Sequence, residues 1–321
     1  MKSWKKAGLT ALAGSLVAFS SAQAEWSASG SASMTYVTHS GTTGDTELSG
    51  SPFGMNKDIT VSGSGELDNG WVVSASHTLD NGSASNSSLT VNFGAAGTLK
   101  YNMVDGALGA GKIDNVMPTA YEEASDGATT GALSQISNGA TGFDYTITVE
   151  GIEVGIGYAP KGAAGATTQG GGVSGAGAGA SEKSIYAKAS PMDGLTIGAG
   201  MGEDNGTAAT SIDVSAFNVT YAMDAFTVGW STYEEDTNAS SGDVTLTAMG
   251  VSYAVNDDLS LSLNQATHEI QGSSDQDSFG ISASLVMGSM TLSANHNSVE
   301  NVGGTSGTDI SGYALGLSFA F

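Results

Sequence analysis

The chain lacks several things that soluble and nucleic-acid-binding proteins usually have. It contains no cysteine, no arginine and only four prolines in 321 residues, and charged side chains occupy 13% of its positions. Without cysteine the fold can use neither disulfides nor thiolate metal sites. With 32 acidic residues against nine lysines, binding to nucleic acid or to an anionic lipid surface is disfavoured. Soluble surfaces usually carry about 25–35% charge, so the scarcity of charge also argues against a soluble domain.

Long apolar runs are missing beyond residue 24, which excludes a membrane-spanning helix there. Residues 2–6 hold three lysines, residues 7–19 are uncharged and mostly apolar, and a small-x-small tripeptide ends at Ala24. This order predicts a cleaved secretory signal peptide over residues 1–24. The alternative, a membrane anchor, would need about 20 apolar residues. The predicted mature chain, 25–321, carries 6 lysines and a net charge of −26.

Alternation of large apolar and small polar residues runs through the rest of the sequence. Leu259, Leu261 and Leu263, for example, are separated by serines. A period of two indicates β-strands, each with one apolar face. We predict sixteen strands, at 26–39, 56–67, 71–80, 87–93, 98–103, 141–149, 152–160, 184–190, 195–203, 210–222, 226–233, 243–255, 259–266, 277–287, 290–296 and 309–321.

The connections between these segments alternate between short turns and long polar loops. An even number of strands with both chain ends on the short-turn side is the plan of an outer-membrane β-barrel. In lipid every backbone polar group must be paired, so the barrel has to close. A soluble β-sandwich is the alternative, but the second face holds mostly Ser, Thr, Gly, Ala and Asn. Aromatic residues expected at the two membrane interfaces are Trp26, Trp71, Tyr221, Phe226 and Tyr253 on one side and Tyr36, Tyr158 and Tyr233 on the other.

The last predicted strand alternates large apolar residues with small ones and ends on an aromatic residue. Its apolar face consists of Tyr313, Leu315, Leu317, Phe319 and Phe321. With the signal peptide, the sixteen segments and one long third loop, the chain resembles the Gram-negative general porins. The resemblance implies a homotrimer in the bacterial outer membrane. It also implies that the barrel-assembly machinery reads the last strand, and that the third loop folds inward and narrows a pore.

The third loop, residues 104–140, is far longer than an ordinary connection, and such loops are usually functional. Its charged residues near the expected constriction are Asp105, Asp114, Glu122, Glu123 and Asp126, against Lys112. Its apolar residues Val116, Met117, Ala120 and Tyr121 could pack on the inner wall and leave Glu122 and Glu123 facing the lumen. The alternative is a solvated loop outside the barrel.

The wall opposite this loop departs from the general porins, which place an arginine cluster there. Here the inward positions of the early strands are neutral, except for Lys100 and for Asp58 near the rim. Lys188 also alternates with apolar residues. A lysine facing lipid at mid-depth costs about 2–4 kcal/mol, so we expect Lys100 and Lys188 to point inward as local counterweights to the loop acids. The constriction should therefore be more uniformly negative than in the general porins.

No catalytic or cofactor-binding constellation emerges, so we do not expect an enzyme. The four histidines do not share metal-ligand spacing. Loop acids at Glu203-Asp204 and Glu234-Glu235-Asp236 could hold Ca²⁺, although runs of charge are more often solvated. We predict passive diffusion of ions and small hydrophilic solutes, with preference for cations. The alternative is a non-channel surface β-protein, a plugged barrel or an adhesin, that binds a partner through its loops.

Overall fold

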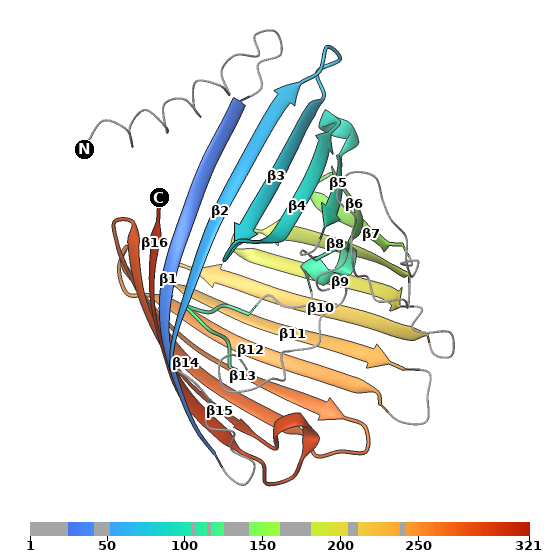
Figure 1. Cartoon of the computed structure of the whole chain (residues 1–321). Helices are drawn as coiled ribbons and strands as arrows, with labels where there is room; N and C mark the ends of the chain where they lie inside the picture. The colour runs from blue at the N-terminus through green and yellow to red at the C-terminus, as the bar shows by residue number, and fades with distance from the viewer. Residues whose placement is uncertain are drawn as a thin grey trace, which may run out of the picture.

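Sixteen antiparallel strands form one closed barrel (Figure 1), as predicted. The computed structural model describes residues 25–41, 52–103, 107–113, 117–124, 141–160, 181–204, 211–237 and 242–321. The predicted signal peptide lies outside these residues. The strands are β1 (Glu25–Gly41), β2 (Phe53–Glu66), β3 (Val72–Asp80), β4 (Ser83–Asn92), β5 (Thr98–Met103), β6 (Gly142–Val149), β7 (Ile152–Ala159), β8 (Glu182–Met192), β9 (Leu195–Asp204), β10 (Ile212–Met223), β11 (Phe226–Asp236), β12 (Val244–Ala254), β13 (Leu259–Ile270), β14 (Gln276–Met287), β15 (Met290–Glu300) and β16 (Ile310–Ala320).

The barrel closes where β1 pairs with both β2 and β16. The Gly30 amide donates to the Phe321 carbonyl at 2.7 Å, and the Phe321 amide donates back to Gly30 at 2.9 Å. These bonds continue the ladder to the last residue, so the seam has no unpaired edge at this point. Closure is what allows strands to cross a bilayer with every backbone group satisfied.

The period of two separates the two faces of the barrel. Large apolar side chains point outward and are exposed, among them Ile156, Trp230 and Leu263. Small polar residues alternate with them and point inward. Within the described residues, no helix is long and apolar enough to cross a membrane.

The predicted interfacial aromatic residues are largely placed as expected, with one error. Trp26, Trp71 and Phe226 are exposed on the outer face. Tyr233, predicted for the opposite interface, points inward instead and is 2% exposed. The adjacent outward position belongs to Thr232, so the prediction for Tyr233 was wrong by one step of the alternation.

One strand end also differs from the prediction. Pro191, expected in the connection, belongs to β8, where the pairing with β9 shifts register between Ala189 and Met192. A proline cannot donate to the ladder and is tolerated at such an irregularity. The turn that follows contains Gly194 at φ 77°, a conformation that glycine adopts without strain.

Candidate functional site

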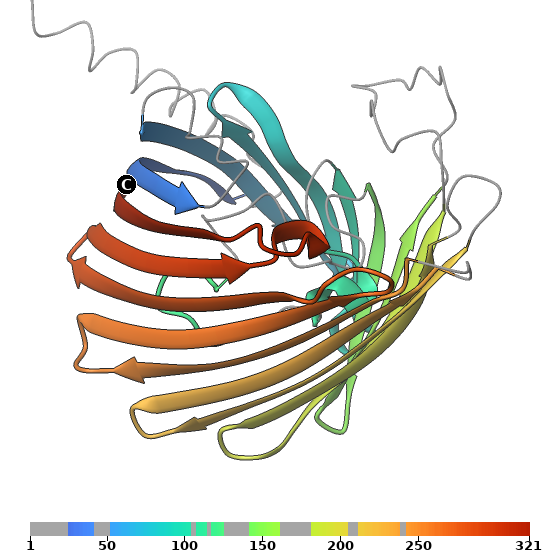
Figure 2. The same cartoon turned by 90° about the horizontal axis from the view of Figure 1, so that it is seen from below.

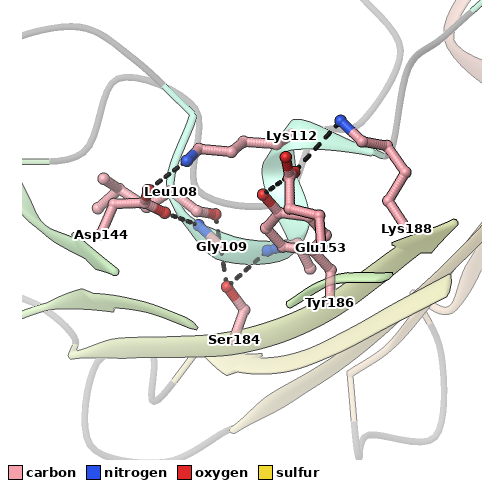
Figure 3. A network of polar contacts seen from close by, with 9 residues as sticks. Leu108, Gly109, Lys112, Asp144, Glu153, Ser184, Tyr186 and Lys188 are labelled. Carbon is pink, nitrogen blue, oxygen red and sulfur yellow. Dashed lines mark hydrogen bonds and ion pairs between the residues drawn. The ribbon is translucent and has the colours of Figure 1, made fainter. Parts of the chain in front are cut away.

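Part of the third loop lies inside the barrel, against the inner faces of β6 to β10. Its short 3₁₀ helix η2 (Gly109–Lys112) is visible within the ring of strands (Figure 2). The Gly109 amide donates to Asp144 Oδ1 at 2.9 Å, and the Ala110 amide donates to Ser184 Oγ at 3.0 Å. Lys112 forms an ion pair with the same carboxylate of Asp144 (Figure 3). The first part of the loop is thus fixed to the wall by one buried acid and one serine.

A second polar group lies beside η2 and involves no loop acid. Tyr186 donates its hydroxyl proton to Glu153 Oε1 at 2.7 Å, and Lys188 Nζ lies 3.2 Å from the same oxygen (Figure 3). The Lys112 ammonium is 6.0 Å from the centre of the Tyr186 ring, within cation–π range. Two acids and two lysines therefore balance one another within this part of the site.

An apolar cluster fills the space between the loop and β8 to β13. Ile113 and Met117 from the loop pack with Tyr186, Tyr233 and Leu246 from the wall. All five are buried. Apolar burial inside an otherwise polar lumen stabilises the inward position of the loop, since burying one such side chain contributes roughly 1.5–3 kcal/mol.

The next described segment, residues 117–124, is held by hydrogen bonds from β13 to β15. The Ala120 amide donates to Ser262 Oγ at 2.9 Å and the Tyr121 amide to Ser282 Oγ at 3.1 Å. Asn297 Nδ2 donates to the Glu123 carbonyl at 2.8 Å. Hydrogen bonds from the wall therefore fix the backbone of this segment.

The side chains of Glu122 and Glu123 are partly exposed. Burial, together with the hydrogen-bonded and negatively charged Glu122, raises the pKa of Tyr121 above its ordinary value. Tyr121 is therefore a neutral neighbour of Glu122 at physiological pH, and it adds no negative charge of its own.

The wall formed by β1 to β4 is different and consists mainly of hydroxyl groups. Ser27 and Ser62 are 2.8 Å apart, and Thr60 and Thr78 are also 2.8 Å apart. These pairs join neighbouring strands across their inward faces. Asp58 accepts a hydrogen bond from Ser31 Oγ at 3.2 Å. Hydroxyl groups of this wall thus bond one another and Asp58.

The structure thus describes some of the predicted site residues and not others. Asp105, Asp114, Asp126 and Val116 lie outside the described residues. Lys100 points inward directly opposite Asp144 on β6, and it forms no ion pair with a described residue. Lys188 also points inward, but its partner is Glu153 rather than a loop acid.

Sequence reasoning missed Asp144 and Glu153 as site residues. Each alternates with apolar residues along its strand, so the inward direction of both carboxylates could be predicted from the sequence. Their ion-pair partners could not be predicted, because Lys112 lies 32 residues from Asp144 in the chain and Lys188 lies 35 residues from Glu153. The roles of Ser184, Tyr186 and Asn297 likewise arise only from the packed loop.

The two acidic clusters predicted to hold Ca²⁺, Glu203-Asp204 and Glu234-Glu235-Asp236, lie at the ends of β9 and β11. Glu234 and Asp236 alternate with the inward Tyr233 and Glu235 along β11. In the part of the chain that the structure describes, no group of three or more His, Asp or Glu residues is placed to hold a metal ion. Ca²⁺ binding at these two clusters stays a prediction.

Comparisons with known proteins agree on family and fold. The family model for Gram-negative porins matches residues 8–321. A porin structure refined at 1.8 Å superposes with a TM-score of 0.67 at 16% identity, covering 92% of this chain and 100% of that one. The anion-selective porin from Comamonas acidovorans gives 0.65 at 11%, covering 93% and 100%. OmpT of Vibrio cholerae gives 0.62 at 12%, covering 93% and 98%. No curated protein matches.

Proposed function

This chain belongs to the Gram-negative porins, channel-forming β-barrels of the bacterial outer membrane, and on that premise we propose that it is a cation-selective diffusion channel. Ions and small hydrophilic solutes cross down their gradients. The third loop narrows the lumen, and its acids Asp105, Asp114, Glu122, Glu123 and Asp126 set the preference for cations.

One observation carries the proposal: two of the inward lysines are already paired. Lys112 binds Asp144, and Lys188 binds Glu153. Neither is left to offset Glu122 and Glu123. Lys100 is then the one described inward lysine without a described ion-pair partner. A lumen with excess carboxylates concentrates cations and repels anions.

The fold itself does not decide selectivity. The Comamonas acidovorans porin, whose name describes it as anion-selective, shares the fold at 11% identity. The preference must therefore come from side chains in the lumen. In this chain the described wall of β1 to β4 offers hydroxyl groups instead of a basic cluster.

The test is the reversal potential of the purified protein in a planar bilayer under a KCl gradient. We expect steady ohmic steps and a cation-selective potential. Replacing Glu122 and Glu123 by glutamine should move that potential toward zero. Asp213→Asn, on the outward face of β10, is the matched control and should not move it.

Two results would contradict the proposal. Anion selectivity of the natural chain would show that the acids of the third loop do not determine ion selectivity. Absence of steps from protein shown to be folded in the membrane would favour the plugged barrel or loop-binding protein instead.

We further propose a homotrimer in the membrane. Lys57 and His77 point outward from β2 and β3 among apolar residues and are exposed. His77 has one polar partner there, Ser87 Oγ at 2.6 Å. Polar groups of this kind are disfavoured against lipid, so a neighbouring subunit is the better cover. Chemical cross-linking in detergent should give trimers, and a product that stays monomeric would contradict this.

A further inference from the structure

The inner face of β11 to β16 carries a row of residues that lie directly opposite one another from strand to strand. Its members are Gly229, Gly250, Asn264, Gly280, Asn297 and Gly312. We call this the glycine–asparagine row. The segment Pro118–Ala124 of the third loop runs along the same wall, and its contacts with the row decide how close it lies.

The glycines of the row let the loop approach the strand backbone. A Cβ added at Gly229 would lie 2.5 Å from Cδ of Pro118, and one at Gly280 would lie 2.8 Å from Cα of Ala124. At Gly250 the added carbon would lie 3.2 Å from the Pro118 carbonyl oxygen. Any side chain at the first two positions would force the loop away from the wall.

The asparagines of the row occupy the spaces between the glycines. Asn297 donates to the Glu123 carbonyl at 2.8 Å. Asn264 is 2% exposed, and its Cβ lies 3.2 Å from the position of a Cβ on Gly250. The row therefore combines recesses at its glycines, which receive loop atoms, with asparagine side chains that restrict sliding of the loop along the wall.

We propose that the glycine–asparagine row positions Glu122 and Glu123, and thereby determines the width and the ion selectivity of the channel. The glycines act through the loop backbone and never touch a passing solute, so they are positioning residues. The inference about selectivity rests on the proposed function. The inference about loop position does not, because it follows from the contacts alone.

A double-mutant cycle tests the contact at Gly229. Gly229→Ala places a methyl group against the proline ring, and Pro118→Ala removes both ring carbons, Cγ and Cδ, that this methyl would meet. We expect Gly229→Ala alone to change single-channel conductance and reversal potential, and the double variant to return both toward the natural values. Such non-additivity is the signature of residues in direct contact.

Two further variants calibrate the effect of an added methyl group. Gly65→Ala, where the added carbon meets nothing within 4 Å, should leave every readout unchanged. Gly250→Ala is more easily accommodated, and it should fold and shift conductance less than Gly229→Ala. If Gly229→Ala fails to fold, Gly250→Ala keeps the proposal testable.

A second readout separates the two levels of the inference. The temperature at which the folded band converts to the unfolded one on a gel reports the contact without requiring conduction. In one outcome the substitutions at Gly229 and Pro118 are non-additive in this temperature, and conductance changes while the reversal potential stays fixed. That outcome would support loop positioning and count against Glu122 and Glu123 as the selectivity filter. If Gly229→Ala has the same conductance, reversal potential and conversion temperature as the natural chain, the proposal is overturned.

Discussion

The two inner walls of the barrel differ in composition and in their contacts with the third loop. The wall from β6 to β16 contacts the described segments of the third loop, and it carries glycines, buried apolar residues and the paired acids Asp144 and Glu153. The wall from β1 to β4 is lined with serine and threonine hydroxyls that bond within the wall. A substitution on the first should alter the position of the loop, whereas one on the second should alter only what a solute meets.

A chain without arginine can still hold segments of its third loop against the inner wall. Holding the loop requires close backbone approach and local charge pairing on one wall, as at Asp144. The other wall has no such requirement and carries mainly hydroxyl groups, with Asp58 on β2. The asymmetry of the lumen therefore comes from where the loop is fixed.

The largest effect on stability is expected at Asp144, on the covered wall. Its side chain is almost fully buried and binds both Lys112 and the Gly109 amide. Asp144→Ala would leave both donors without that acceptor, and leaving the buried Gly109 amide unsatisfied costs about 1–3 kcal/mol. We expect a lower conversion temperature on gels and noisier single-channel current.

Ser74→Ala is the control for that experiment, because Ser74 lies inward on the hydroxyl wall in β3. It should leave both readouts unchanged. An equal fall in conversion temperature for Asp144→Ala and Ser74→Ala would contradict the distinction between the two walls.

A smaller effect is expected from the asparagines. Asn297→Ala removes a hydrogen bond to the Glu123 carbonyl, and a bond of this kind contributes about 1 kcal/mol. Asn264→Leu should be nearly neutral, since neither amide atom of Asn264 has a partner among the described residues. Conversion temperatures of the two variants check the order, and a reversed order would show that Asn297 does not hold the loop.

Alkaline pH should weaken the covered wall slightly through Tyr121. Its pKa is raised above 10.0 in the folded chain, so the folded state binds the phenol proton more tightly than the unfolded one. This contribution is present below about pH 10 and is lost as pH rises through the raised pKa. Above pH 10 the conversion temperature should fall more steeply for the natural chain than for Tyr121→Phe, and parallel curves would contradict this.

The smallest effect on stability is expected on the hydroxyl wall. Ser76→Lys places a cation on the inward face of β3, at a partly exposed position opposite Ser62. The conversion temperature should stay the same while the reversal potential moves away from cation selectivity. A loss of stability with unchanged selectivity would show that the two walls do not divide these roles.

The barrel could be predicted from sequence because its pattern is local. Lipid outside and water inside impose a two-residue period that each strand displays alone, as Leu259 to Leu263 does. The error at Tyr233 arose at a strand end, where alternation continued and an aromatic residue was assigned to the membrane interface by type.

The glycine–asparagine row could not be predicted in the same way. Gly250 and Asn297 become members of one row only through the register of four successive strands, which no single segment encodes. The Lys112–Asp144 pair depends in addition on the path of the loop inside the barrel. The inward direction of Asp144 could be predicted from the sequence, but its ion-pair partner could not.

The most direct test of the account is the accessibility of Glu122 within a conducting channel. The chain contains no cysteine, so Glu122→Cys would introduce a unique thiol. We expect a negatively charged thiol reagent to modify it during recording and to restore cation selectivity, and a positively charged one to reduce cation current in discrete steps. Modification that leaves current and selectivity unchanged, or a thiol that neither reagent reaches in an open channel, would contradict the placement of the acidic segment at the constriction.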